Sequence, residues 1–255
     1  MKCNRIALLA LALSGCAFAD SNVFIAVGNQ QFGVVDVNNG AYSQRGSLGF
    51  IPAGLGEINN VVYTGMFGGT TLFSVNTSNG ATSAIGDGST TFFALGSTAN
   101  ALYTLDQSGA LYSISPTTGA TTFLGSTGIS VGSNFTGIST GSNLLYVTVG
   151  QNLYSINPTV STAATLIGST GVGAIGALVA ENGSVFGTSV VNSNAVYQMN
   201  LSTGNAVYTS FLQAPDYAYG LAPDIPEPPA VALLVVAGLI AGGYALRRRR
   251  IAAAA

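Results

Sequence analysis

A strand–turn–strand pattern recurs along the chain between residues 20 and 224. In the unit that starts at Ala110, apolar and polar side chains alternate over residues 111–114, which is the two-residue period of a half-buried strand. Residues 116–119 (PTTG) follow, and a proline that fixes φ with a glycine that tolerates positive φ predicts a tight turn before a second strand. The same hairpin is predicted in four other units, which start at Gln31, Thr71, Asn152 and Ala195.

One of these five hairpins has an unusual turn. The other units end the turn with a glycine, at Gly40, Gly80, Gly119 and Gly204. The unit that starts at Asn152 has residues 160–161 (VS) there instead, so we expect its turn to differ.

Two further strands are predicted ahead of each hairpin. The first is short and rich in small residues, and its apolar markers recur at intervals of 40, 43, 40 and 43 residues: Leu55, Leu95, Ile138, Leu178 and Leu221. The second is centred on an aromatic residue: Phe24, Tyr63, Tyr103, Tyr146 and Phe186. Four strands in a unit of about 40 residues are typical of a β-propeller blade, whose crowded innermost strand favours small side chains.

The two ends of the repeat region complement each other. The region begins on a second strand at 23–27, and it finishes with an unpaired first strand at 219–223. Pairing these strands would complete a blade and remove two exposed sheet edges. The predicted fold class is therefore all-β: a five-bladed β-propeller over residues 20–224, closed by pairing of the N- and C-terminal strands. A β-solenoid or a sandwich built from the same hairpins is the alternative.

The chain ends with an apolar segment followed by basic residues. Residues 230–246 carry no charge, and as a helix they would be about 25 Å long, near the lower limit for crossing a bilayer. Four arginines follow, and a basic cluster of this kind holds a helix end on the cytoplasmic side: Arg247, Arg248, Arg249 and Arg250. We therefore predict a C-terminal transmembrane helix over 230–246, with a buried core helix as the alternative.

The order of these C-terminal features resembles a known sorting signal. Pro226, Glu227 and Pro228, then an apolar segment, then the arginine cluster, are similar to the PEP-CTERM signal of Gram-negative bacteria, over residues 225–255. The resemblance implies that an exosortase-type transpeptidase in the inner membrane recognises the tail and cleaves near the Pro-Glu-Pro triplet. It also implies release or attachment at the cell surface, often in species that make exopolysaccharide.

The N-terminus has the pattern of a secretory signal peptide, residues 1–19. Two basic residues precede an apolar stretch, and Ala17 and Ala19 form a small-x-small cleavage site. Residues 13–16 (LSGC) also fit a lipobox, which would make Cys16 a lipidated N-terminus. Cleavage after Ala19 is favoured, and it would remove both cysteines of the chain, so no disulfide or thiol nucleophile would remain.

The composition of residues 20–224 narrows the possible functions. This stretch has no lysine, histidine or tryptophan, and Arg45 is its single basic residue. Nucleic acid is not expected as a partner, because phosphate binding needs clustered basic side chains. Without histidine and cysteine the usual general bases, thiol nucleophiles and soft metal ligands are missing, so no cofactor and no metal are expected.

Paired carboxylates are the remaining catalytic option. Glu57 and Glu181 each lie near the end of a predicted innermost strand, and a pair of this kind can hydrolyse glycosides. The more economical interpretation is that both are isolated solvated acids. The sequence thus predicts an exported, non-enzymatic surface or matrix protein that binds polysaccharide or another protein. A carboxylate-dependent glycan hydrolase or lyase is the alternative.

Overall fold

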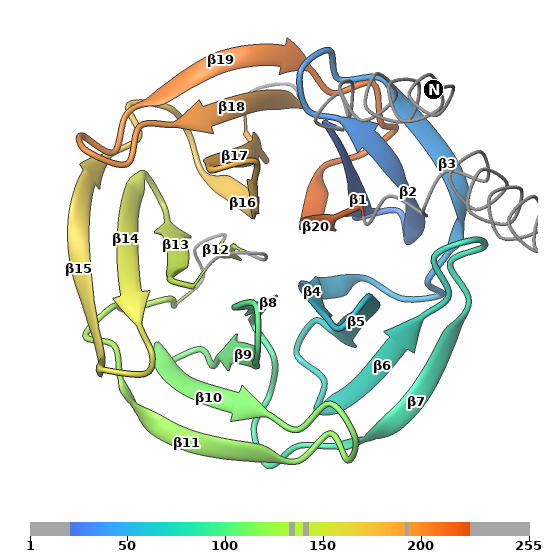
Figure 1. Ribbon diagram of the computed structural model, residues 1–255, viewed down its shortest axis with the longest axis vertical. Coiled ribbons are helices and arrows are strands. Elements are labelled where there is room, and N and C mark those ends of the chain that lie inside the picture. The colour runs from blue at the N-terminus through green and yellow to red at the C-terminus, as the bar shows by residue number, and fades with distance from the viewer. Residues whose placement is uncertain (1–20, 133–135, 140–142, 192–193, 225–255) are drawn as a thin grey trace, which may run out of the picture. The chain divides into compact units, whose positions relative to one another are not determined.

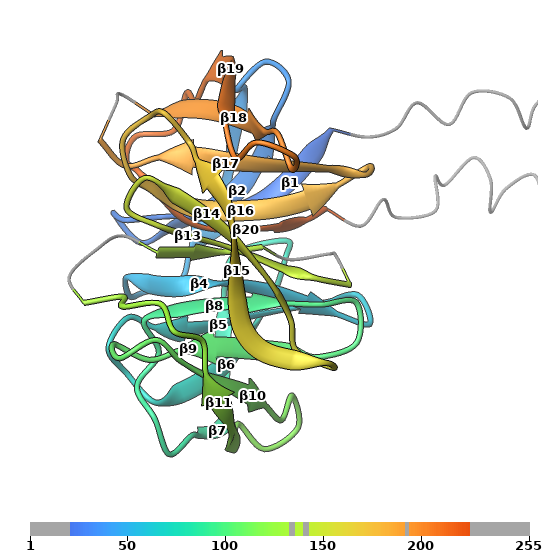
Figure 2. The ribbon, with the colours of Figure 1, turned by 90° about the vertical axis from the view of Figure 1, so that its left-hand side faces the viewer.

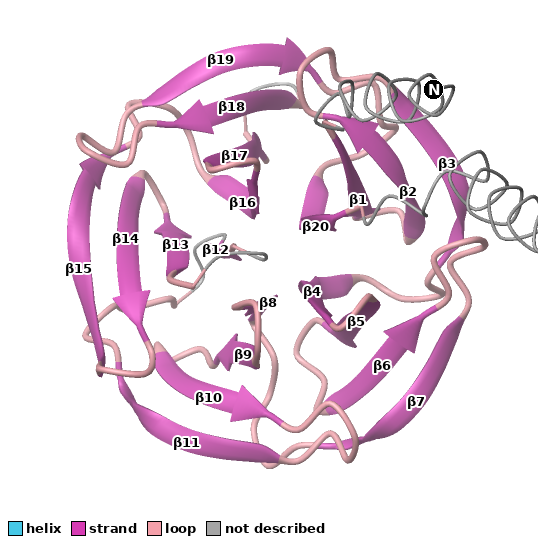
Figure 3. Ribbon diagram, in the orientation of Figure 1, coloured by secondary structure: helices cyan, strands magenta, loops and turns pink. Residues whose placement is uncertain are grey.

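Twenty β-strands joined by turns make up the part of the chain that the computed structural model describes, residues 21–132, 136–139, 143–191 and 194–224. Figure 3 shows strands and loops only in this part. All five predicted hairpins are present, and the all-β character of the repeat region is confirmed.

Two of the four sheets follow the predicted unit of four antiparallel strands. One has the order β12-β13-β14-β15, with β12 (Thr136–Ile138), β13 (Leu145–Val149), β14 (Asn152–Asn157) and β15 (Ser161–Ser169). The other has the order β16-β17-β18-β19, with β16 (Ile175–Glu181), β17 (Ser184–Ser189), β18 (Ala195–Met199) and β19 (Ala206–Phe211).

A third sheet joins the two ends of the repeat region. Its order is β20-β1-β2-β3, with β20 (Ala218–Pro223), β1 (Asn22–Val27), β2 (Gln31–Asp36) and β3 (Tyr42–Ser47). β1 and β20 run antiparallel, with Ile25 opposite Leu221. The expected pairing of the first and last strands is therefore present.

The fourth sheet has eight strands, in the order β11-β10-β9-β8-β4-β5-β6-β7. It combines two predicted units: β4 (Pro52–Ile58), β5 (Val61–Met66), β6 (Thr71–Val75) and β7 (Thr82–Asp87), then β8 (Ala94–Ser97), β9 (Leu102–Leu105), β10 (Ala110–Ile114) and β11 (Thr121–Ser126). β4 and β8 are joined by a parallel pairing of Gly54 with Leu95.

The predicted closed five-bladed β-propeller is therefore wrong: the structure has four sheets, not five separate blades. The physical reason lies at Gly54, where a Cβ would overlap the backbone of Leu95. Because glycine has no Cβ, β4 approaches β8 closely enough for the two strands to pair. The sequence pattern showed that this position is crowded, but it did not show that the crowding leads to pairing.

The predicted transmembrane helix is also corrected. None of the described residues lies in a helix, and none belongs to a helix long and apolar enough to cross a membrane. Residues 230–246, where that helix was expected, lie outside the described residues. The fold is therefore classed by its strands alone.

The strands surround a common centre (Figure 1). β4, β8, β12, β16 and β20 lie innermost, and we call them the inner strands; β3, β7, β11, β15 and β19 lie outermost and are the outer strands. Each inner strand contacts at least two other inner strands. Seen from the side, the turns lie at two opposite faces (Figure 2).

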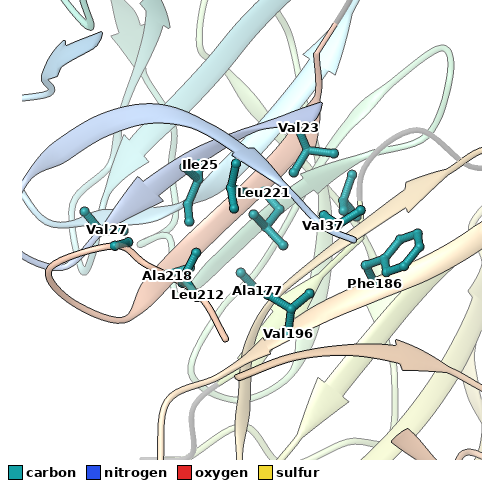
Figure 4. Close-up of a cluster of buried hydrophobic side chains, with 13 residues drawn as sticks. Val23, Ile25, Val27, Val37, Ala177, Phe186, Val196, Leu212, Ala218 and Leu221 are labelled. Atoms are coloured by element: carbon teal, nitrogen blue, oxygen red, sulfur yellow. The ribbon is translucent and has the colours of Figure 1, made fainter. Parts of the chain in front are cut away.

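Hydrophobic clusters fill the space between neighbouring groups of strands. β1 shows how: Val23, Ile25 and Val27 point into one cluster, and the alternate residues Phe24 and Ala26 into another. The strand is buried on both faces, so it is apolar throughout rather than alternating. Figure 4 shows the first cluster, where β1 and β20 meet side chains from β16, β17 and β18.

A glycine contact repeats between neighbouring outer turns. The Cβ of an alanine at Gly46 in β3 would overlap the carbonyl of Asn79, which lies in the turn between β6 and β7. Equivalent contacts join Gly86 to Gly119 and Gly168 to Gly204. The three pairs are thus Gly46 with Gly80, Gly86 with Gly119, and Gly168 with Gly204. In each pair the two backbones lie in contact, which leaves no room for a side chain on either residue.

Candidate binding site

The carboxyl ends of three inner strands lie side by side. The Ser97 hydroxyl at the end of β8 donates to the carbonyl of Glu57 in β4 at 2.9 Å, and it accepts from the Glu57 N–H at 3.1 Å. The Ser97 N–H donates to the carbonyl of Ser139, just after β12, at 3.3 Å. These hydrogen bonds fix the ends of β4, β8 and β12 next to one another, where the turns that follow β8 and precede β13 emerge.

A cleft of about 360 Å³ opens at this place. Four segments supply its lining: the turn after β8, the start of β9, the residues before β13 and the turn between β14 and β15. The lining residues are Thr98, Asn100, Ala101, Tyr103, Asn143, Leu144, Asn157 and Thr159. None of them is ionisable at neutral pH, and the volume lies in the lower part of the range typical of small-molecule sites.

Several polar groups of the cleft are available to a ligand. The side chains of Asn100 and Asn143 are exposed and make no hydrogen bond to a described residue. Asn157 uses its Oδ1 to accept from the N–H and hydroxyl of Thr159, at 3.3 and 2.8 Å, which leaves its amide NH₂ as a donor. The apolar contribution comes from Ala101, Leu144 and the buried Tyr103 side chain.

Glu57 makes a hydrogen bond within the turn that follows β4. Its carboxylate Oε1 accepts from the Asn60 N–H at 2.7 Å, in a turn where Asn59 and Asn60 both have positive φ. Burial raises the pKa of the nearby Tyr63 phenol, and the negative charge of Glu57 raises it further. The carboxylate thus stabilises a strained turn.

Glu181 ends β16, and the structure does not pair it with Glu57. β20 contacts both β4 and β16 and lies between them in Figure 1. Among the described residues, no group of three or more acidic, histidine or cysteine side chains is placed to hold a metal ion. The two acids that the sequence singled out are therefore not shown to form a site.

Other carboxylates also hold turns. Asp36 accepts from the Asn38 N–H at 2.9 Å and from the Asn39 side-chain amide at 2.6 Å. Asp106 accepts from the N–H groups of Ser108 and Ala110, both at 2.9 Å. These oxygens replace backbone hydrogen-bond partners in tight turns, as Asx residues commonly do.

Arg45 is the single basic side chain among the described residues, and its contacts are structural. Its guanidinium lies over the Phe24 ring, 5.5 Å from the centroid, and donates to the carbonyl of Thr77 at 3.1 Å. It also approaches Asp224 at 3.8 Å. The cleft therefore has no nearby cation to attract an anionic ligand.

Tyr103, one of the aromatic residues that mark the second strands, has two environments. It is 6% exposed and belongs to the cluster between β8–β10 and β12–β14. The sequence did not indicate that the same side chain also lines a cleft. No local pattern could have shown this, because the other lining residues come from segments up to 56 positions away, as far as Thr159.

The remaining predicted site residues lie outside the described part of the chain. They are the cleavage-site residues Ala17 and Ala19, the lipobox residue Cys16, the sorting residues Pro226, Glu227 and Pro228, and the cluster Arg247–Arg250.

Comparison with known proteins identifies a fold and no family. No family model matches the sequence, and no curated protein matches it. A chain from the structure described as "Crystal structure of Nidogen/Laminin Complex" is similar, with a TM-score of 0.53 and 11% identity over 79% of this chain and 97% of that chain. This protein thus belongs to the class of β-rich repeat folds, and at that identity the likeness concerns the fold alone.

Proposed function

We propose that this protein is an exported, non-enzymatic surface or matrix protein that binds polysaccharide or another protein. Its delivery rests on the signal peptide of residues 1–19 and on a sorting tail that an exosortase-type transpeptidase recognises at Pro226, Glu227 and Pro228. The inner membrane is its location before processing, and the cell surface or the extracellular space its location afterwards. The β-rich fold shared with a chain of an extracellular complex supports this proposal.

One observation carries the binding role. The cleft beside β8 and β13 is lined by amides, hydroxyls and apolar groups, and its lining has no carboxylate, histidine, lysine or cysteine to activate a hydroxyl or act as a general base. A concave surface with a few polar groups and no reactive group is suited to holding a ligand rather than to breaking a bond.

Mass spectrometry of both mature termini tests the delivery. The expected N-terminal residue is Asp20, and the expected C-terminus lies near the Pro-Glu-Pro triplet, without Arg247–Arg250. Mature protein outside the cell that still carries the arginines would refute sorting by cleavage. A lipid on Cys16 would show that the lipobox, and not cleavage after Ala19, sets the N-terminus.

Turnover of matrix glycans tests the alternative of a hydrolase or lyase. The purified chain is incubated with the host's exopolysaccharide and the products are followed by chromatography, for the wild type and for Glu57→Gln with Glu181→Gln. We expect no products from either protein and equal glycan binding by both. Products from the wild type that disappear in the double variant, with binding kept, would establish an enzyme instead.

A further inference from the structure

We infer that the cleft between β8 and β13 binds a neutral saccharide, and that Asn100 and Asn143 are its main hydrogen-bonding residues. The inference deepens the proposed function, on which it rests, by naming one site and one chemical class of ligand.

The polar groups of the cleft match hydroxyl groups. A sugar hydroxyl both donates and accepts a hydrogen bond, and a carboxamide side chain offers one acceptor oxygen and two donor protons. Asn100 and Asn143 present complete amides of this kind, and Asn157 presents its NH₂. Thr98 adds a hydroxyl that has no hydrogen bond to a described residue.

The apolar part of the lining fits the other side of a sugar ring. Ala101, Leu144 and Tyr103 offer carbon surface beside the amides. A pyranose carries C–H groups on its faces and hydroxyls at its rim, so a lining of mixed character contacts both. A ligand that is apolar throughout would leave the amides of Asn100 and Asn143 without partners when it displaces water, which is costly.

The charge of the described region selects against acidic sugars. It has seven carboxylates, and its one basic side chain, Arg45, is held by Thr77 and Asp224. A uronate or a sulfated sugar would meet a negative field and no cation in the cleft. The lining also has no carboxylate, so it lacks the charged oxygen ligands that a cation site usually needs, and neutral sugars are the favoured class.

The test uses the full chain and two asparagine variants. Binding of neutral probes (oligomers of glucose, galactose and mannose) is measured by saturation-transfer NMR and calorimetry, for the wild type and for Asn100→Ala combined with Asn143→Ala. We expect at least one neutral oligomer to bind, with the double variant weakening it about tenfold or more, because two hydrogen bonds to the ligand are lost. Asn205→Ala is the matched control, since Asn205 is an exposed asparagine in the turn before β19, and its binding should stay within twofold of the wild type.

Three results would overturn the inference. The first is that no neutral oligomer binds at millimolar concentration. The second is binding that the double variant leaves unchanged. The third is a peptide or an oligouronate that binds better than every neutral oligomer and competes at the same residues. Each of these can occur while the mature termini still show export and sorting, so failure of the inference is separable from failure of the proposed function.

Discussion

Four buried threonines allow the cost of one unpaired hydroxyl to be measured. Thr64, Thr104 and Thr148 are fully buried on the second strands of their units, and each hydroxyl donates to a backbone carbonyl at 2.8, 2.9 and 3.0 Å. Thr188 in β17 is also buried, at 1% exposed, but its Oγ1 has no hydrogen-bond partner.

Replacing these threonines with valine should give effects of opposite sign. Thr188→Val removes an unsatisfied polar atom, so we expect the free energy of unfolding to rise by about 1 kcal/mol. Thr64→Val removes a buried hydrogen bond to the Gly54 carbonyl, so a loss of about 1–2 kcal/mol is expected. Valine's higher strand propensity applies at both positions and cancels in the comparison.

Thermal unfolding followed by circular dichroism is a suitable assay. In a domain of about 200 residues these changes correspond to a rise of roughly 2–4 °C for Thr188→Val and a fall of roughly 3–6 °C for Thr64→Val. Thr104→Val, which loses a hydrogen bond of 2.9 Å, is the second control and should follow Thr64→Val. A Thr188→Val variant that loses as much stability as the two controls would refute the reasoning, because it would show that the Thr188 hydroxyl is satisfied.

Three further predictions concern packing, pH and the single basic side chain. Gly46→Ala should lower the free energy of unfolding in a urea titration by about 3 kcal/mol, because its Cβ would overlap the backbone of a neighbouring turn. Gly69→Ala is the control, because its Cβ would lie 3.1 Å from its nearest neighbour, the Met66 carbonyl oxygen. This variant should change the free energy of unfolding by less than half as much as Gly46→Ala. Equal losses would contradict the steric explanation. Burial raises the pKa of Tyr42 from 10.0 to about 12, so the stability that its neutral phenol contributes is present below pH 10 and is lost as the pH rises towards 12. Tyr42→Phe should therefore flatten the plot of unfolding free energy against pH between pH 10 and pH 12. An unchanged plot would show that Tyr42 does not cause the loss. Arg45→Ala should lower the free energy of unfolding by about 1 kcal/mol. This loss should exceed that of Asp224→Asn, because Arg45→Ala removes the contact with the Phe24 ring as well as the ion pair. Equal losses would mean that the ring contact contributes nothing measurable.

The strands were predictable because their signals are local. Alternation over 111–114 and the glycine at Gly119 identify a hairpin within ten residues of sequence, and the structure places β10 and β11 there. The pairing of β1 with β20 followed from the offset between the two ends of the repeat. These features depend on residues close together in the sequence or on the number and order of the repeats, and both can be read from a single sequence.

The sheet organisation and the cleft were not predictable in the same way. The pairing of Gly54 with Leu95 depends on how closely two inner strands approach, which repeat spacing does not encode. The cleft brings Asn100 and Asn143 together from different units. Each asparagine, considered alone, is an ordinary turn residue, and nothing near either one in the sequence indicates a shared site.

One sequence signal nevertheless pointed towards the cleft. In four units the outer turn ends with a glycine, with φ between 73° and 85°, and the turn rests against a neighbouring outer strand. In the fourth unit Asn157 pairs directly with Ser161, so the turn is tighter and has no glycine. It meets its neighbour differently, because a Cβ at Gly125 in β11 would contact the Thr162 side chain and not the backbone of a turn.

That same irregular turn supplies Asn157 and Thr159 to the cleft. A repeat protein keeps its units alike where they only pack against each other, and a unit that departs from the pattern at a concave surface is a candidate for function. Restoring the common turn tests this directly: replacing residues 157–163 with the NTSNGA sequence of residues 76–81 should keep the fold and weaken binding of the neutral sugar. If a stable variant with the regular turn binds as well as the wild type, the irregularity has no part in binding.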